Sequence, residues 1–258
     1  MPDLGRFAAS AMVNLSRSRT LPLAGLVLIA LVAYGASAGG LPSLPSGLDV
    51  AFHAVLVFPA FAAAIWLGLP LARTSTGRLL ALVVTAGALA VAFSLLGADS
   101  AANVAKLACY ACAGFCFLTL FEELWWLALV AVLVPWVDIW SVAAGPTQYV
   151  VEQRPGIFEH VAVALPNLGE TATVSIGPPD VVFFALFLAA ADRFRLRVAA
   201  TWLTMTGLLA ATLVLVWAWE DVVGLPALPA ICLGFLVPNA DLIWRDVRRA
   251  RARPTEST

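Results

Sequence analysis

Two aspartates lie within apolar stretches of this chain, where carboxylates are rare. Asp138 is part of "VPWVDIWSV" and Asp180 is part of "SIGPPDVVFF". A carboxylate at membrane depth costs about 2.5–3.5 kcal/mol on insertion scales, so each of them is a functional hypothesis. Two carboxyl groups within hydrogen-bond distance share one proton, so one can activate a water while the other polarises a carbonyl. This pair of residue types therefore fits amide hydrolysis.

Asp180 has a second interpretation, because it directly follows two prolines. Pro is favoured in the first turn of a helix, and an Asp there can cap the helix start or face a polar cleft. The sequence alone leaves both interpretations of Asp180 open.

The composition places these residues in a lipid bilayer. Hydrophobic residues make up 62% of the 258 residues and charged residues 12%, against roughly 45–50% and 25% in an average soluble domain. No basic face suggests nucleic acid as a partner, so the expected surroundings are lipid.

Windows of about 19 residues predict an all-α polytopic membrane protein with about eight transmembrane helices. The apolar segments are residues 21–38, 51–72, 79–97, 101–121, 124–142, 178–191, 198–217 and 222–237. At about 1.5 Å per residue most of them can cross a core of about 30 Å. Segment 178–191 is short and needs help from its flanks.

The first segment has a competing interpretation as a signal peptide, since basic residues precede it and Ala36, Ser37 and Ala38 could form a cleavage site. Its apolar run is longer than the usual 7–15 residues of such peptides. We expect the segment to be retained, and its removal would not change the topology of the rest.

The arginines predict the orientation, because cytoplasmic loops carry the excess of Lys and Arg. With a cytoplasmic N-terminus, the inner side collects Arg6, Arg17, Arg19, Arg73, Arg78, Arg193, Arg195, Arg197, Arg245, Arg248, Arg249, Arg251 and Arg253. The outer side keeps Arg154 and Lys106. Both termini are therefore expected in the cytoplasm.

Helix geometry places both aspartates at a similar depth. Asp138 lies about 21 Å from the inner surface along its helix, and Asp180 lies about 17 Å from it. A third feature, Pro226 in "GLPALPAI", lies about 18 Å from the inner end of the last helix. Two prolines three residues apart leave backbone groups unpaired, which membranes tolerate only where they line a cavity or are covered by protein.

These stretches resemble the signature regions of a known family, in the same order. "VDIWSV" with "GPTQYVVE", then "IGPPDVVFF", then "PALPAI" are similar to the motifs of the presenilin and signal peptide peptidase family of intramembrane aspartyl proteases. The resemblance covers roughly residues 124–238, with "PALPAI" as the most specific piece. It implies a presenilin-like C-terminal catalytic half.

The resemblance implies a hydrolase of the bacterial or archaeal plasma membrane that cuts a transmembrane-helix polypeptide within a transmembrane or signal-anchor helix, with no cofactor and no metal. The site residues that it implies are Asp138 and Asp180 as catalytic pair and Gly177, Pro226, Ala227 and Leu228 as substrate-binding residues. The expected organisation is a cytoplasmic segment 1–20, a four-helix half 21–121, a catalytic half 122–240 with outer loop 145–176, and a basic tail 241–258. A homo-oligomer or a partner subunit stays open.

Three departures from the family pattern keep alternatives open. The family's Gly-x-Gly-Asp is Gly177, Pro178, Pro179 and Asp180 here, so either a helix begins at these prolines or the site has lost its activation movement. Val137 stands where the family has a Tyr before the first Asp, and this chain has eight predicted helices where family members have nine. A catalytically inactive helix-binding relative and a proton-coupled transporter using the same pair are the alternatives. The orientation favours the signal peptide peptidase branch, whereas "GPTQYVVE" looks more like presenilin.

Two further patterns concern the surroundings of the site. Residues 171–176, "TATVSI", alternate polar and apolar residues after "PNLG", which predicts a strand. This strand could pair with an unwound substrate, and an ordinary surface hairpin is the alternative. Cys109, Cys112 and Cys116 share a helix face but have no partnering His, so we interpret them as packing residues.

Overall fold

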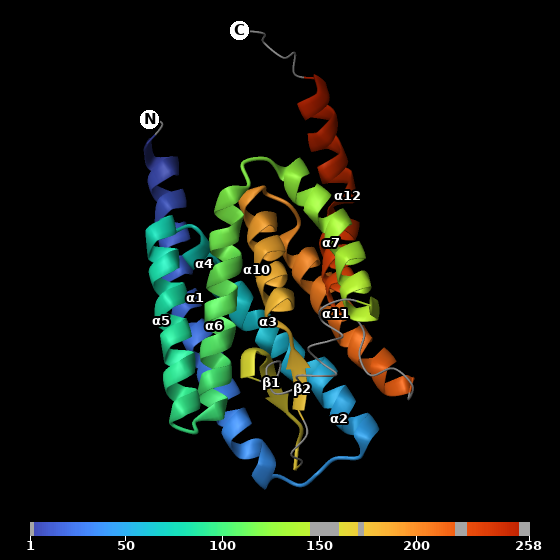
Figure 1. Ribbon diagram of the computed structural model, residues 1–258. Helices are drawn as coiled ribbons and strands as arrows, with labels where there is room; N and C mark the ends of the chain where they lie inside the picture. Colours follow the sequence, from blue (N-terminus) through green and yellow to red (C-terminus); the bar gives the residue numbers. More distant parts are fainter. Residues whose placement is uncertain (1–2, 145–159, 170–172, 220–225, 253–258) are drawn as a thin grey trace.

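The apolar segments fold as helices in the computed structural model, which describes residues 3–144, 160–169, 173–219 and 226–252. The first half contains α1 (Asp3–Ser37), α2 (Ser46–Phe52), η2 (His53–Val57), α3 (Phe58–Leu67), α4 (Leu69–Ala72), α5 (Thr76–Leu95) and α6 (Asp99–Phe117). The second half contains α7 (Leu124–Ala144), β1 (Val163–Pro166), β2 (Thr173–Ile176), α10 (Pro178–Arg193), α11 (Val198–Ala218) and α12 (Leu228–Ala252). Helix occurs at each of the predicted positions (Figure 1).

Five of these helical stretches are long and apolar enough to cross a membrane, which marks the chain as an integral membrane protein. They are Thr20–Gly40, Ser46–Ala72, Thr76–Leu95, Asp99–Leu120 and Val198–Ala218. The second stretch runs from α2 to α4 and includes a π-helical turn at η2. Helix α7 has a shorter apolar part, Leu124–Trp140.

The last helix differs from its prediction at its C-terminal end. It continues through Pro238 to Ala252, so residues 241–252 are helical instead of forming the expected tail. Pro238 cannot donate to the carbonyl of Gly234, four residues earlier, and Thr204 donates its hydroxyl to this carbonyl at 2.6 Å instead. The freed acceptor is therefore satisfied from α11, and the helix continues. Residues 222–225 of the prediction lie outside the described residues.

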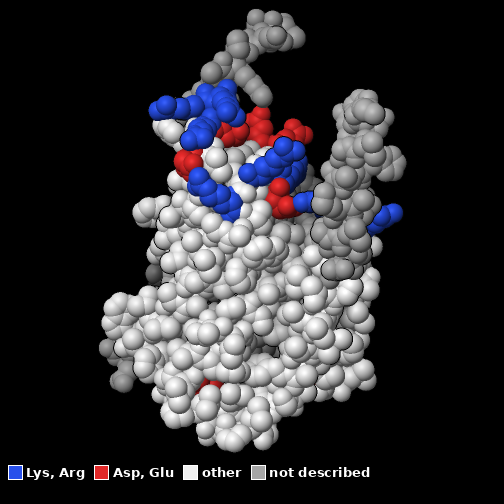
Figure 2. Space-filling model, turned by 180° about the vertical axis from the view of Figure 1, so that it is seen from behind, with Lys and Arg blue, Asp and Glu red and all other residues white. Residues whose placement is uncertain are grey.

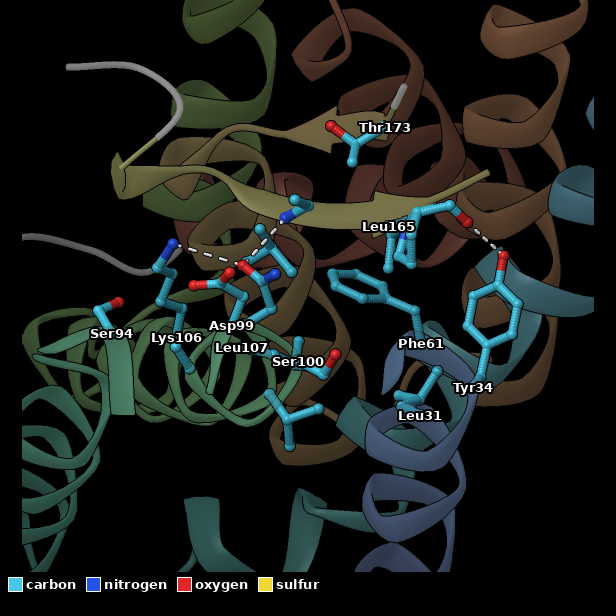
Figure 3. Close-up of a pocket in the computed structure, with 17 residues that line it drawn as sticks. Leu31, Tyr34, Phe61, Ser94, Asp99, Ser100, Lys106, Leu107, Leu165 and Thr173 are labelled. Carbon is cyan, nitrogen blue, oxygen red and sulfur yellow. Dashed lines mark hydrogen bonds between the residues drawn. The ribbon is translucent and has the colours of Figure 1, made fainter. Parts of the chain in front are cut away.

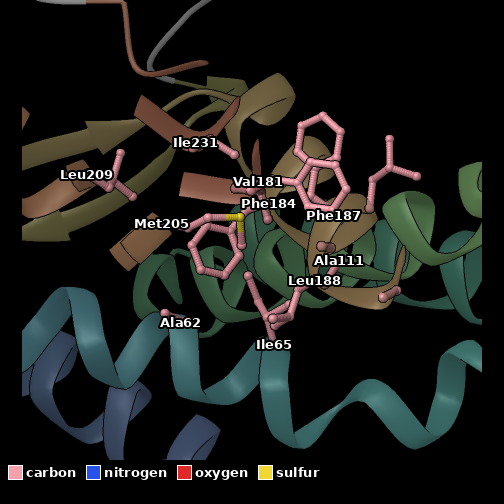
Figure 4. Close-up of a cluster of buried hydrophobic side chains, with 14 of the residues drawn as sticks. Ala62, Ile65, Ala111, Val181, Phe184, Phe187, Leu188, Met205, Leu209 and Ile231 are labelled. Carbon is pink, nitrogen blue, oxygen red and sulfur yellow. The ribbon is translucent and has the colours of Figure 1, made fainter. Parts of the chain in front are cut away.

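Helix α10 lies at the centre of the molecule, between α6, α11 and α12 (Figure 1). All its residues from Phe184 to Ala191 are buried, as expected for a helix that is apolar on every face. Its rings pack against the neighbours, and Phe187 stacks on Phe235 of α12 with 4.7 Å between ring centroids. Figure 4 shows Phe184 and Phe187 with Met205 of α11 and Ile65 of α3 in this core.

Two glycines allow helices to approach closely. A Cβ on Gly114 of α6 would lie 2.4 Å from the carbonyl oxygen of Val182 in α10. A Cβ on Gly234 of α12 would lie 2.6 Å from the Cα of Met205 in α11. Small residues at helix crossings are the usual means of packing in membranes, because apolar side chains gain little by leaving lipid.

A two-stranded antiparallel hairpin is the exception to the all-α expectation. Strand β1 pairs with β2, with Val163 opposite Ile176 and Pro166 opposite Thr173. The strand expected at 171–176 is confirmed for its described part, and it leads directly into α10. The turn contains Gly169 at φ +68°, whose amide donates to the carbonyl of Ala38 at 2.8 Å.

Charged side chains gather at one end of the face shown in Figure 2, and most of the rest of that face is uncharged. Two ion pairs join helices among these residues: Arg73 lies 2.7 Å from Asp192, and Arg197 lies 2.6 Å from Asp241. The Arg197 guanidinium lowers the pKa of Asp241, which lies beyond the apolar part of α12. The orientation of this end relative to the cytoplasm stays a prediction.

The close approach of α11 and α12 predicts a cost for any side chain at Gly234. We expect Gly234→Ala to lower the free energy of unfolding by about 1–3 kcal/mol, because the methyl group must displace the backbone at Met205. Denaturation in detergent micelles measures this change. Gly207→Ala on α11 is the matched control, since nothing lies within 4 Å of the added Cβ. Equal effects of the two substitutions would contradict the argument.

Candidate active site

The carboxylate of Asp138 contacts the start of α12. Its Oδ2 accepts a hydrogen bond from the backbone N–H of Leu228 at 3.3 Å. Leu228 is the first residue of α12, and the first turn of a helix has N–H groups without partners inside the helix. The prolines Pro226 and Pro229 on either side have no N–H. The structure therefore brings "PALPAI" to Asp138, as the depth argument anticipates.

Asp180 is the third residue of α10 and caps that helix. Its Oδ2 accepts the N–H of Gly177 at 3.2 Å, and Gly177 is the N-cap residue. Pro178 and Pro179 fill the first two positions of the helix, where a missing N–H costs nothing. Of the two interpretations of "GPPD", the one in which a helix begins at the prolines is therefore what the structure adopts.

Gly177 also leaves room beside the carboxylate. A Cβ at this position would lie 3.1 Å from Asp180 Oδ2, which is tighter than an ordinary van der Waals contact. Its φ of −66° is available to any residue. The glycine is therefore needed for space beside Asp180 and not for backbone freedom.

The two aspartates lie on helices that contact one another, α7 and α10. Their carboxyl groups are near enough to interact electrostatically, and α7 contacts both α10 and α12. In the described part of the chain no hydrogen bond joins the two carboxyl groups directly. Each carboxylate holds one backbone N–H through a single oxygen, so its second oxygen stays available for a water or a substrate.

The remaining predicted site residues lie around Asp138. Pro226 and Ala227 form the irregular segment just before α12 and are half-buried, while Leu228 is buried. Cys232, one turn further along α12, is fully buried and within electrostatic range of Asp138. Among the described residues no group of His, Cys, Asp and Glu has the arrangement of a metal site.

The hairpin that leads to Asp180 is held along the outer edge of β1. Side chains of α1 and α6 bind this edge at every second residue: Lys106 donates to the carbonyl of Ala162 at 3.1 Å, Asn103 accepts the N–H of Ala164 at 3.2 Å, and the Tyr34 hydroxyl donates to the carbonyl of Pro166. The outer edge of β1 is therefore occupied by side chains.

This pattern also defines the free edge of the hairpin. Since Ala164 directs its N–H away from β2, the pair Ala164–Ser175 is a non-hydrogen-bonded pair of the ladder. Ser175 and Thr173 then direct their backbone groups away from β1, and both residues are exposed. No residue in the described ranges donates to or accepts from this edge of β2.

A buried polar cluster ties the hairpin turn to α2. Asp49 accepts the N–H of Leu168 at 3.3 Å, and His53 has its Nε2 3.3 Å from the carbonyl of Pro166. The His53 Nδ1 lies 2.9 Å from the carbonyl of Asp49 within the same helical segment. His53 thus has a structural role. Sequence reasoning did not identify this cluster or the residues that bind β1, although polar residues within apolar helices were the available signal.

Comparisons with protein-family models, with curated proteins and with solved structures find no match for this chain.

The contact between Asp138 and Leu228 predicts a local effect of substitution at Asp138. We expect Asp138→Leu to increase amide hydrogen exchange in the first turn of α12 about tenfold or more, because the N–H loses a charged acceptor worth about 1.5–3 kcal/mol. Asp138→Asn is the matched control, since its carbonyl can still accept. Hydrogen exchange with mass spectrometry measures both variants, and equal exchange in the two would contradict the contact.

Proposed function

We propose that this chain is an intramembrane aspartyl endopeptidase that hydrolyses a peptide bond within a transmembrane or signal-anchor helix. The observation that carries the proposal is the convergence of three separate stretches. Asp138 binds the broken start of α12 through Leu228 while it interacts electrostatically with Asp180. These are the residues that the resemblance to presenilins and signal peptide peptidases assigns to catalysis and substrate binding.

The mechanism follows from two carboxyl groups that share one proton. The ionised carboxylate takes a proton from a water, whose oxygen attacks the scissile carbonyl carbon. The protonated carboxyl group donates its proton to the carbonyl oxygen, which gives a neutral tetrahedral intermediate. Collapse of this intermediate breaks the C–N bond: one hydroxyl group gives its proton to the carboxylate that had protonated the carbonyl oxygen, and the amine leaves with a proton from the carboxyl group that had taken one from water. The dyad returns to its single shared proton.

In the proposed topology the chain crosses the membrane eight times, with both termini in the cytoplasm. The charged end of the molecule then faces the cytoplasm, and the hairpin faces the outer side. Helix α10 has only 16 residues, so its start at Asp180 lies below the outer surface, beneath the hairpin. In this topology water reaches the aspartates from the outer side of the membrane, past β2.

The free edge of β2 supplies a way to hold the substrate. A helix cannot be hydrolysed while its amides are hydrogen-bonded internally, so a segment must unwind first. An unwound segment can pair with the backbone of Thr173 and Ser175 as an added strand. This strand position is followed after Ile176 by Gly177 and Asp180, so a paired segment runs toward the dyad.

The alternative is an inactive relative that binds membrane helices. It is favoured by one specific observation, namely that Asp180 uses a carboxylate oxygen to cap its own helix and shares no hydrogen bond with Asp138 in the described part of the chain. Catalysis requires both carboxyl groups within reach of one water, whereas binding of a helix requires neither. The first test must therefore separate cleavage from binding.

The dyad predicts that both aspartates are required for cleavage. We expect the purified protein in lipid to cleave members of a panel of tagged single-helix polypeptides. Asp138→Ala and Asp180→Ala should each lower the cleavage rate about 10²–10⁴-fold, because each removes one partner of the acid–base pair.

Glu122→Ala is the matched control, because it removes an exposed carboxylate at the charged end of the molecule. Co-purification of each polypeptide with the protein measures binding in the same preparation. Polypeptides that bind without being cut by the folded wild-type protein would favour the inactive relative.

The edge of β2 gives a second prediction. Ser175→Pro removes one outward N–H without removing a bond to β1, so kcat/KM should fall about fivefold or more through KM. Ser175→Ala keeps the N–H and should leave kcat/KM near the wild-type value. Steady-state cleavage at several substrate concentrations measures both parameters. If the two variants lose kcat/KM equally, the side chain and not the backbone edge holds the substrate.

A further inference from the structure

A cavity of about 300 Å³ lies between the hairpin and the helices of the N-terminal half. Its walls come from α1, α3, the end of α5, the start of α6, and the hairpin (Figure 3). A volume of this size is at the lower end of the range of small-molecule sites. Thr173 of β2 lines it as well, whereas Asp138, Asp180, Gly177, Pro226, Ala227 and Leu228 do not.

One wall of the cavity is polar. Asp99, Asn103 and Lys106 are spaced by four and three residues and so share one face of α6. Lys106 is the single lysine of the chain and interacts electrostatically with Asp99. Ser94 and Ser100 add hydroxyl groups to this wall. The wall therefore presents one carboxylate and one ammonium group, carried by residues about 10 Å apart along the helix axis.

These polar groups are only partly used by the protein. Lys106 donates to Asn103 Oδ1 and to the carbonyl of Ala162, so one of its three donors is left. The Asn103 amide accepts through its oxygen, and its NH₂ group donates to no described residue. The Asp99 carboxylate likewise accepts no hydrogen bond within the described ranges. A ligand could thus find both donors and a negatively charged acceptor here.

Another wall is apolar and adjoins helices that face lipid. Leu31, Phe61 and Leu165 line it (Figure 3). Only 6% of the span window that contains Leu31 and 11% of the window of α5 are buried inside the protein. Asp99 follows the turn after α5 directly, so the polar wall starts where the two spans end. Such a position is the boundary between head groups and acyl chains.

We propose that this cavity binds the head group of a phospholipid that carries a primary ammonium group and a phosphodiester. The ammonium group donates to Asp99, and the phosphate accepts from Lys106, from the Asn103 amide and from the serine hydroxyls. The volume accommodates a head group but not two acyl chains, so the chains lie along the exposed faces of α1 and α5. This proposal does not depend on protease activity.

The charges of Asp99 and Lys106 determine which phospholipid head groups the cavity distinguishes. A quaternary ammonium head group has no N–H to donate to Asp99, and an anionic glycerol head group places no cation there. Phosphatidylethanolamine is therefore the matching probe, with phosphatidylcholine and phosphatidylglycerol as comparisons. Soluble glycerophosphoethanolamine has the same head group without acyl chains and separates a lipid site from a site for a free phosphodiester.

The test is native mass spectrometry of the delipidated full chain in detergent, titrated with each probe. We expect phosphatidylethanolamine to bind about tenfold more tightly than phosphatidylcholine, since a hydrogen bond to a charged group is worth about 1.5–3 kcal/mol. Asp99→Asn should remove this preference, whereas Lys106→Gln should weaken the binding of both lipids, because both carry the phosphodiester. Asp99 is exposed, so its variant tests the proposal even where Lys106→Gln fails to fold.

The controls remove one charge of each sign at the other end of the molecule. Glu122→Gln and Arg78→Gln change exposed residues and should keep the lipid preference. Equal binding of phosphatidylethanolamine and phosphatidylcholine by the wild type would overturn the proposal. So would a preference that survives in Asp99→Asn, or binding of glycerophosphoethanolamine as tight as that of the lipid.

Discussion

Backbone polar groups cannot be left unpaired in hydrocarbon, and the unusual features of this chain follow from that constraint. Prolines leave backbone groups of α12 without helical partners at two places. At each place a side chain of another helix forms a hydrogen bond with the backbone. At the N-terminal end Asp138 accepts the N–H of Leu228, and further along the helix Thr204 donates to the carbonyl that Pro238 leaves free. The hairpin is an open sheet, and its outer edge on β1 is paired with side chains of α1 and α6. Side chains from other elements thus satisfy these parts of the backbone, whereas the edge of β2 has no partner among the described residues.

This constraint gives the two aspartates a structural role beside any chemical one. Each holds a helix start through one oxygen, which fixes the carboxyl group relative to the backbone of α10 or α12. A group oriented in this way loses less entropy when it acts on a substrate, since its rotamer is already set. The arrangement also has a consequence for mutagenesis, because removing either carboxylate disturbs a helix start. Loss of activity alone therefore does not distinguish a catalytic carboxylate from a capping one, whereas amide exchange in α12 does.

The helices were predictable from the sequence, because long apolar runs in a membrane have few other ways to pair their backbone. The strand before Asp180 was predictable from its alternation, and the depth argument brought "PALPAI" to Asp138. The continuation of α12 past Pro238 was not predictable, because it depends on Thr204 from another helix. The roles of His53 and Asn103 were not predictable either, because each contacts a backbone group more than 60 residues away in the sequence. Local patterns show where a helix or strand forms, but they do not show which distant side chain satisfies its ends.

The four-helix N-terminal half holds the hairpin in place. Strand β2 leads into α10 within two residues, so the position of the hairpin determines the entry to Asp180. The hairpin is held by Tyr34 from α1, by Asp49 and His53 from the second span, and by Asn103 and Lys106 from α6. Lys106 and Asn103 also line the cavity on that side, so a phosphate bound there would draw on the same side chains that hold β1. Occupancy of the cavity and the position of the hairpin are then linked, and the lipid next to α1 and α5 bears on the geometry of the strand that precedes Asp180.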